Sequence, residues 1–323
     1  MQNHIPHFHD FWRHRLLLFD KLTLGYLVLV PVLILLSGKH VHLWPVIAVA
    51  HPLLIAGLLA LIRYQQRLPV ALRWLRDWYP VLLFTFFFST IGRLVTLFLP
   101  FWLEPFLLRS DVWFLQQHPW EFFARHLTPL TTEIFSFAYW SYYLLIPLVA
   151  AVHYLPLRLS RDVAPTKPAF DGVMARLCLV MYTCYACFLL LPARGPHHVL
   201  NLDHDLLFAG GWFYSSILFI QAKGSVVGAA FPSSHVAAAW AALFTLRQSF
   251  RRLFWTVLPL VLLLSASTFV IQYHYIIDSV GGILVAVAVE ALMTRREKRE
   301  QAERLSFTTA GRRVLEPAAR SQW

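Results

Sequence analysis

The sequence predicts an all-α integral membrane protein with about eight transmembrane helices. Only 14% of its 323 residues are charged, 58% are hydrophobic, and the mean hydropathy is positive. In soluble proteins about a quarter of the residues are charged, and one soluble core of this size would not hide so much apolar surface. The composition also excludes a disordered chain, because disordered chains are polar and poor in aromatic residues.

The apolar residues are grouped in runs, and a run of about 17 to 25 residues is long enough to cross a bilayer. We expect spans at residues 20–38, 44–62, 79–99, 133–153, 173–192, 234–249, 254–272 and 275–294. The sixth run is short and rich in alanine, which is typical of a helix that packs closely against its neighbours. We divide the chain into a two-helix membrane extension (1–78), a six-helix membrane core (79–294) and a basic cytoplasmic tail (295–323).

The positive charges predict the topology. With the N-terminus inside, the inner segments hold most of the Lys and Arg residues, and many of these crowd into residues 295–320. Because basic residues are retained on the cytoplasmic side, both termini are expected to be cytoplasmic. The net charge of +11 therefore indicates a membrane protein, and no nucleic-acid partner is expected. The sequence does not indicate the oligomeric state.

Two predicted outer segments are too long to be simple turns. Residues 100–132 interleave tryptophans with acidic side chains: Trp102, Glu104, Asp111, Trp113, Trp120 and Glu121. This composition predicts amphipathic helices that lie at the membrane interface. The second segment, 193–233, contains polar and aromatic stretches, and long ordered loops often carry functional residues.

Three short polar segments, residues 191–196, 231–235 and 267–278, fall on the same predicted outer face. In the last of them, His274 and Asp278 are four residues apart, so both side chains lie on one side of a helix. A carboxylate can hold one imidazole nitrogen and leave the other free as a nucleophile or base. The alternative is a structural His–Asp hydrogen bond at a helix end.

The middle segment begins a helix. Serine is a preferred N-cap residue, and the free backbone N–H groups at the start of a helix favour an anion. We therefore expect Ser233 and Ser234 to bind phosphate and His235 to supply a proton, with ordinary helix capping as the alternative. In the first segment, Arg194 is expected to bind phosphate through paired hydrogen bonds, or else to reach lipid head groups.

Together these side chains make a phosphoryl-transfer set of nucleophile, acid, orienting carboxylate and anion-binding groups. The predicted outer face has no cluster with the spacing and carboxylates that would hold magnesium. We therefore expect chemistry without a metal, and no cofactor.

The three segments resemble the motifs of the type 2 phosphatidic acid phosphatase superfamily. The middle motif of that family reads Pro-Ser-Gly-His, and Pro232-Ser233-Ser234-His235 departs from it only at the glycine. The last motif reads Ser-Arg, five residues, His, three residues, Asp; here it starts Ser267-Thr268 and keeps both the histidine and the aspartate.

The first motif has Lys, six residues and Arg-Pro, where this chain has Cys187 and Arg194-Gly195-Pro196. Two phosphate-binding cations of the family are therefore replaced. These departures are closest to the inositol phosphorylceramide synthase-like branch, which transfers a phospho-head-group between lipids. The resemblance covers residues 79–294 and matches the six-helix core of the superfamily.

The resemblance implies a role for each matched residue. His274 attacks phosphorus and forms a phosphohistidine, Asp278 orients His274, and His235 protonates the leaving group. Arg194 and Ser233 hold the phosphate oxygens, and Ser267 matches a motif position. The partners are membrane lipids: a lipid phosphate or phospholipid donor and an alcohol or lipid acceptor. The motif departures slightly favour transfer over hydrolysis.

Arg93 is a candidate to replace the missing motif arginine, since it falls about six residues inside the outer end of the third predicted span. The alternative for Arg93 is an interfacial arginine.

Two rival functions remain. A plain lipid phosphate phosphohydrolase would release free phosphate, and a lipid transporter or flippase would carry ionisable groups through the membrane midplane. The active site is expected on the periplasmic, extracellular or lumenal side.

Overall fold

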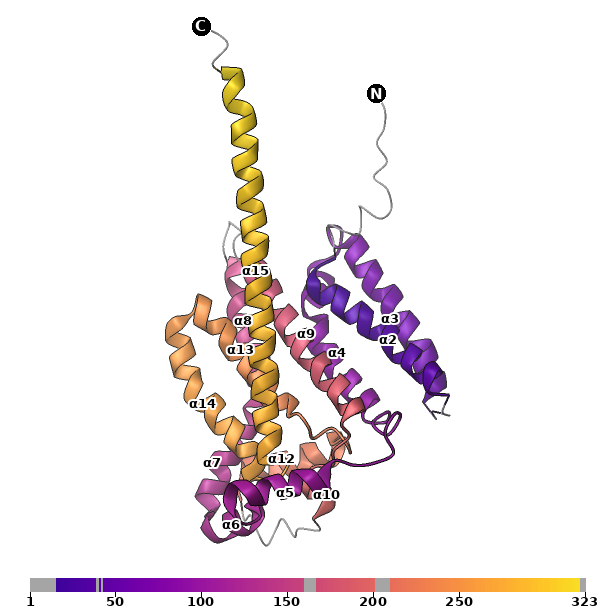
Figure 1. Cartoon of the computed structure of the whole chain (residues 1–323), viewed down its shortest axis with the longest axis vertical. Coiled ribbons are helices and arrows are strands. Elements are labelled where there is room, and N and C mark those ends of the chain that lie inside the picture. Colours follow the sequence, from indigo (N-terminus) through magenta and orange to yellow (C-terminus); the bar gives the residue numbers. More distant parts are fainter. Residues whose placement is uncertain (1–15, 39–40, 42, 160–166, 201–209, 320–323) are drawn as a thin grey trace.

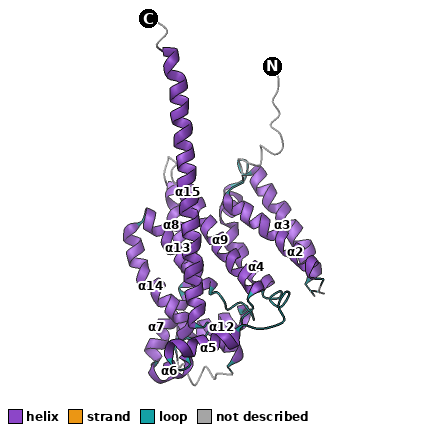
Figure 2. Cartoon of the chain, in the orientation of Figure 1, coloured by secondary structure: helices purple, strands orange, loops and turns teal. Residues whose placement is uncertain are grey.

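The computed structural model describes residues 16–38, 41, 43–159, 167–200 and 210–319, and these residues are folded into helices joined by loops (Figures 1 and 2). The long helices are α2 (Leu18–Ser37), α3 (Trp44–Tyr64), α4 (Val70–Ile91), α8 (Tyr142–Leu159), α9 (Lys167–Leu190), α13 (Ser234–Ser249), α14 (Arg251–Val270) and α15 (Ile276–Ala319). The shorter ones are α5 (Glu104–Leu115), α6 (Pro119–His126), α7 (Pro129–Trp140), α10 (Pro196–Val199) and α12 (Trp212–Gly224).

Several of these helices have the length and composition of membrane spans. Within the described residues, α2, α3, α9, α14 and α15 are long and apolar enough to cross a bilayer, and α7 with α8 makes a sixth span if the bent pair is counted as one. The integral membrane class is therefore supported, whereas the predicted number of about eight spans is met only in part. Helix α13 has only 16 residues, and α4 carries Arg73, Arg76 and Asp77 near its start.

The predicted span 133–153 is not one straight helix. It is divided into α7 and α8, which are bent by 43° relative to each other. The break falls at Ser141, whose hydroxyl donates to the Ala138 carbonyl (2.6 Å). Two short helices, α5 and α6, form within residues 100–132, where the composition predicts amphipathic helices.

Helix α13 is the centre of the bundle, and it packs against α8, α9, α14 and α15. Five of its alanines (237, 238, 239, 241 and 242) are almost fully buried. Small side chains let helix backbones approach closely where apolar burial alone does not drive association. The alanine-rich sequence thus explains why this short helix takes the central position.

The N-terminal pair α2 and α3 packs on one side of the core, with α2 against α9 and α3 against α4 (Figure 1). A buried ion pair joins α2 to α4: Arg76 Nη2 donates to Asp20 Oδ2 at 2.6 Å. The Tyr79 hydroxyl donates to the other carboxylate oxygen at 2.8 Å. Both charged side chains are buried, so the attraction between them must offset the free energy that each loses when it leaves water.

Helix α15 continues through the predicted boundary at residue 294 and extends beyond the rest of the bundle (Figure 1). Near this boundary, Arg176 of α9 donates to Glu290 (2.7 Å) and to Glu297 (2.8 Å). One arginine therefore fixes the middle of the long helix over two turns.

We predict that Asp20→Ala lowers the free energy of unfolding by about 3–5 kcal/mol, because it leaves Arg76 buried without its counter-ion. Thermal unfolding of the purified protein in detergent measures the effect. The control is Glu303→Ala, which breaks an exposed ion pair with Arg299 and should change the stability by less than about 1 kcal/mol. Equal effects of the two variants would contradict a stabilising role for the Asp20–Arg76 pair.

Candidate active site

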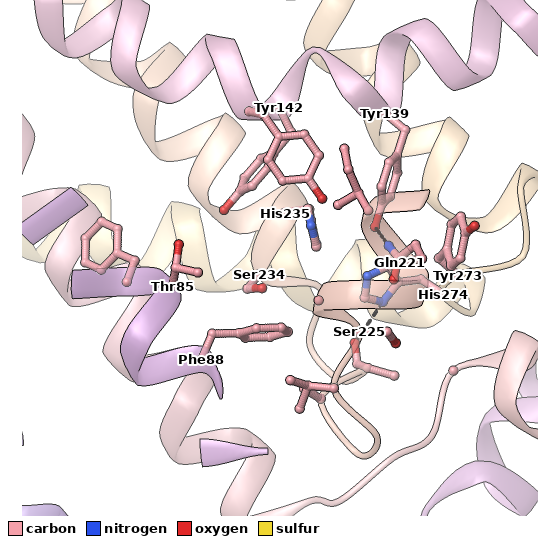
Figure 3. A pocket seen from close by; sticks show the side chains of 18 of the residues that line it. Thr85, Phe88, Tyr139, Tyr142, Gln221, Ser225, Ser234, His235, Tyr273 and His274 are labelled. Carbon is pink, nitrogen blue, oxygen red and sulfur yellow. Dashed lines mark hydrogen bonds between the residues drawn. The ribbon is translucent and has the colours of Figure 1, made fainter. Parts of the chain in front are cut away.

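A cavity of about 210 Å³ lies where the three polar segments meet (Figure 3). Each segment supplies part of its wall: Gly195 from the first, Ser234 and His235 from the second, and His274 from the third. The other walls come from α4, α7, α8, α9, α12 and the loop before α13. The structure thus brings parts of all three distant segments to one cavity.

The start of α13 is held directly against α15. Ser233 caps α13, its hydroxyl accepting from the Val236 N–H (3.4 Å), and its own N–H donates to the Asp278 carbonyl at 2.9 Å. A side chain on Gly282 would lie 2.6 Å from the Ser233 carbonyl oxygen. The absence of a Cβ at Gly282 is therefore what lets the two helix starts approach.

His274 is held at its Nδ1 atom. This nitrogen lies 3.0 Å from the Ala230 carbonyl oxygen and 3.3 Å from Asp278 Oδ2. Both neighbours are acceptors, so the tautomer they favour carries the proton on Nδ1 and the lone pair on Nε2. Asp278 is fully buried, and its Oδ2 also accepts from the Tyr275 N–H (2.9 Å). The pair therefore has the orientation that a histidine nucleophile needs.

His235 faces the same cavity, with its ring centroid 5.8 Å from that of His274. It is surrounded by tyrosine rings, with centroids of Tyr142 at 4.4 Å and Tyr139 at 5.1 Å (Figure 3). Its Nδ1 is buried without a hydrogen-bond partner. His235 at the start of α13 and His274 in the turn before α15 are thus close enough to act on one small group between them.

Arg194 does not line the cavity, although its neighbour Gly195 does. Its Nε donates to the buried Glu104 carboxylate, and its guanidinium lies over the Trp102 ring, 4.9 Å from the centroid. The side chain is 37% exposed. The guanidinium predicted to bind phosphate is therefore engaged by α5 in this structure.

The serines of the motifs divide into two groups. Ser234 lines the cavity. Ser233 and Ser267 are fully buried and outside it, and the Ser267 hydroxyl donates to the Leu264 carbonyl (2.7 Å). Thr268, at the position of the missing motif arginine, shares a hydrogen bond with Ser279 of α15 (2.7 Å). That position therefore joins α14 to α15 and offers no charge to the cavity.

The predicted position of Arg93 inside a membrane-spanning helix is wrong. Helix α4 ends at Ile91, and Arg93 lies beyond it, exposed and outside the cavity wall. The apolar pattern continues through Leu94, Val95 and Leu97, which are buried in the following turns. Burial of a non-helical segment therefore made residues 92–99 look like part of the span.

Several cavity residues escape sequence reasoning (Figure 3). Tyr139, Tyr142 and Gln221 lie outside the three segments, and Tyr273 lies in the third segment but at no motif position. Gln221 of α12 donates to the Tyr139 hydroxyl (2.9 Å). Burial raises the pKa of Tyr273, so its hydroxyl is a neutral hydrogen-bond donor. The aromatic cluster at residues 139–143 is the signal in the sequence that would have pointed to Tyr139 and Tyr142.

The cavity wall contains histidines, tyrosines, serines and Gln221, but no Asp, Glu, Lys or Arg among the described residues. Nor does the described part of the chain hold three or more His, Cys, Asp or Glu residues grouped as a metal site. The arrangement offers a nucleophile, a proton carrier and neutral hydrogen-bond donors.

Comparison with known proteins gives one match. The family model described as the PAP2 superfamily matches residues 106–292, which is more than half of the chain and includes all three segments of the site. No curated protein and no solved structure matches the chain.

We predict that Gly282→Ala destabilises the fold by about 1–3 kcal/mol, because the added methyl group overlaps the Ser233 carbonyl and forces α13 away from α15. Gly57→Ala is the matched control, since a Cβ there meets nothing within 4 Å; it should raise stability by up to about 1 kcal/mol. Thermal unfolding in detergent compares the two variants. Equal stability of Gly282→Ala and wild type would contradict the proposed close approach.

Proposed function

Because the chain belongs to the PAP2 superfamily, we propose that it is a metal-independent membrane lipid phosphotransferase that acts through a phosphohistidine on His274. Membership of this superfamily supports a phosphatase- or phosphotransferase-type activity. The observation that carries the finer proposal is the pair His274 and His235, which face one cavity with ring centroids 5.8 Å apart.

In the first step, the Nε2 lone pair of His274 attacks the phosphorus of the donor lipid, and the bond from phosphorus to the leaving oxygen breaks. The negative charge of the bound donor favours the protonated form of His235, which gives its proton to that oxygen, so the first product leaves as a neutral alcohol. Asp278 stabilises the positive charge that develops on the His274 ring, because its Oδ2 lies 3.3 Å from Nδ1, the atom that carries the proton.

In the second step, His235 is neutral and takes the proton of an acceptor hydroxyl. The acceptor oxygen then attacks phosphorus, the bond from phosphorus to Nε2 breaks, and His274 is regenerated. An alcohol acceptor gives a transferase, and water gives a phosphatase. The two outcomes differ only in which hydroxyl enters the cavity.

Phosphate oxygens are held by neutral donors in this proposal. Ser234 and Gln221 line the cavity, and the start of α13 directs N–H groups towards an anion. Ser233 and Ser267 act as supports of that wall. Arg194 reaches the phosphate only if it leaves Glu104, and Arg93 could act only from outside the cavity wall.

The absence of charged side chains from the described cavity wall favours a phosphodiester donor. A phosphodiester carries one negative charge, whereas a phosphomonoester carries about 1.5–2 at neutral pH. Bringing the second charge into an uncharged cavity is unfavourable unless a cation pairs with it. A phospholipid diester leads to transfer of a phospho-head-group, which supports the transferase.

The lipid nature of the donor is supported by the cavity's surroundings. Phe84, Phe88 and Tyr143 form part of its wall, and Thr85 and Tyr143, which both line it, are exposed. We assign the cavity to the periplasmic, extracellular or lumenal side. Helices α5, α6, α10 and α12 gather at the end of the bundle opposite the basic half of α15 (Figure 1), and basic residues stay cytoplasmic.

We predict that His274→Ala and His235→Ala each lower turnover by at least about 100-fold. The assay uses protein in detergent with excess chelator, a phosphorus-labelled panel of lipid phosphates and phospholipids, and reactions with and without an alcohol acceptor. Label on the acceptor establishes transfer. Label released in water alone establishes hydrolysis, as free phosphate from a lipid phosphate or as the phosphorylated head group from a phospholipid. Activity that survives His274→Ala would exclude the proposed nucleophile, and activity lost in chelator would exclude a metal-independent mechanism.

We also predict that a phospholipid diester is used with a kcat/KM at least about 10-fold above that of the phosphomonoester with the same acyl chains. Gln221→Lys adds an ammonium group to the cavity wall and should shift this ratio towards the monoester. Competition between the two labelled lipids in mixed micelles measures it. A preference of wild type for the monoester would contradict the charge argument.

A further inference from the structure

Helix α5 presents a buried polar face to the site. Glu104, Leu107 and Asp111 are its buried residues, and their spacing of three and four residues places them on one side of the helix. Glu104 holds Arg194, and the Leu103 N–H donates to the Pro192 carbonyl (2.9 Å). One face of α5 therefore contacts the first motif segment, and the same face continues to Asp111.

Asp111 contacts the segment that carries the nucleophile. Its Oδ1 accepts from the N–H of Ile276 (2.9 Å), the first residue of α15. The first N–H groups of a helix have no partner within the helix, so this carboxylate is the cap of α15, supplied by another helix. It is 2% exposed.

Three consecutive backbone N–H groups around the nucleophile are each held by a different element. The His274 N–H donates to the Thr268 carbonyl of α14 (2.9 Å). The Tyr275 N–H donates to Asp278 of α15 (2.9 Å), and the Ile276 N–H donates to Asp111 of α5. The backbone on the C-terminal side of His274 is thus fixed from outside α14 and α15 by Asp111.

We propose that Asp111 is a positioning residue, which sets the orientation of His274 by capping α15 at Ile276. This inference rests on the proposed function of His274 as nucleophile. Without the cap, the first turn of α15 loses a backbone hydrogen bond, and the His274–Asp278 geometry loosens. A misplacement of about 1 Å in a reacting group lowers a rate by up to about 100-fold.

The neighbours of Asp111 suggest the conservative variant. Burial raises the pKa of Asp111 to about 7, the hydrogen bond from Ile276 opposes that rise, and the nearby Asp278 carboxylate adds to it. Either protonation state keeps an oxygen that accepts from Ile276. An asparagine has the same shape and a carbonyl oxygen at the same place, so Asp111→Asn retains the cap, whereas Asp111→Leu removes it.

The experiment compares Asp111→Leu, Asp111→Asn and Ser110→Ala with wild type in detergent. Ser110 is the matched control, because its hydroxyl donates only within α5, to the Leu107 carbonyl (2.7 Å). Two readouts are used: kcat and KM for the labelled phospholipid that wild type turns over, and hydrogen–deuterium exchange of the amides in residues 273–279. The exchange readout does not depend on activity.

We expect Asp111→Leu to lower kcat about 10- to 100-fold with KM within about twofold, and to speed exchange in residues 273–279. Asp111→Asn should keep kcat within about threefold of wild type and retain amide protection, and Ser110→Ala should match wild type in both readouts. The contrast between the leucine and asparagine variants at one position separates loss of the cap from a general loss of folding.

Three results would overturn the proposal. Unchanged kcat in Asp111→Leu would show that capping does not position His274, and unchanged exchange would show that Asp111 does not hold this segment. Equal losses of kcat in the asparagine and leucine variants would show that the carboxylate charge, and not the cap, is what matters. Wild type without turnover on any lipid would instead overturn the proposed function, and the positioning role would fall with it.

Discussion

The site depends on one close approach between two helix starts. The Ser233 N–H donates to the Asp278 carbonyl, and Gly282 leaves room for the Ser233 carbonyl. His235 is two residues after Ser233, and His274 is four residues before Asp278. This contact therefore fixes the positions of the two histidines relative to each other. The alanine-rich face of α13 continues the approach along the helix. The separation of the two histidines is therefore set by backbone packing, which is stiffer than any contact between long side chains.

The uncharged cavity follows from where the polar groups of the motifs are used. Thr268 bonds to Ser279, Ser267 to its own helix, and Arg194 to Glu104. The first contact joins α14 to α15, the second lies within α14, and the third joins the segment after α9 to α5. The wall of the cavity is left with hydroxyls, an amide and imidazoles. The proposed site would select by the charge of the phosphate group, because its described wall has no cation to offset a second negative charge.

The sequence predicts the outline of this fold well, because long apolar runs and i,i+4 pairs depend on local residues only. The membrane class and the meeting of the three motif segments follow from those patterns. Three features do not. The prediction places Arg93 inside a helix because the buried turns that follow α4 are as apolar as a helix. The break at Ser141 interrupts an apolar run that continues without a proline or glycine through residues 139–143. The engagement of Arg194 by Glu104 joins residues 90 positions apart, a pairing that no single sequence specifies.

Buried charge in the described residues serves to position backbone and helices. The buried charged side chains are Asp20, Arg76, Glu104, Asp111, Arg176 and Asp278. Each has a partner on a different element or, for Asp278, on His274 and the Tyr275 N–H, and none lines the cavity. In apolar surroundings a charged side chain is stable only when a group of opposite charge or a hydrogen-bond partner lies next to it, so it fixes the position of that partner. The charges therefore fix the geometry, and the proposed mechanism leaves bond breaking to two imidazoles, which can hold or release a proton without the cost of a permanent buried charge.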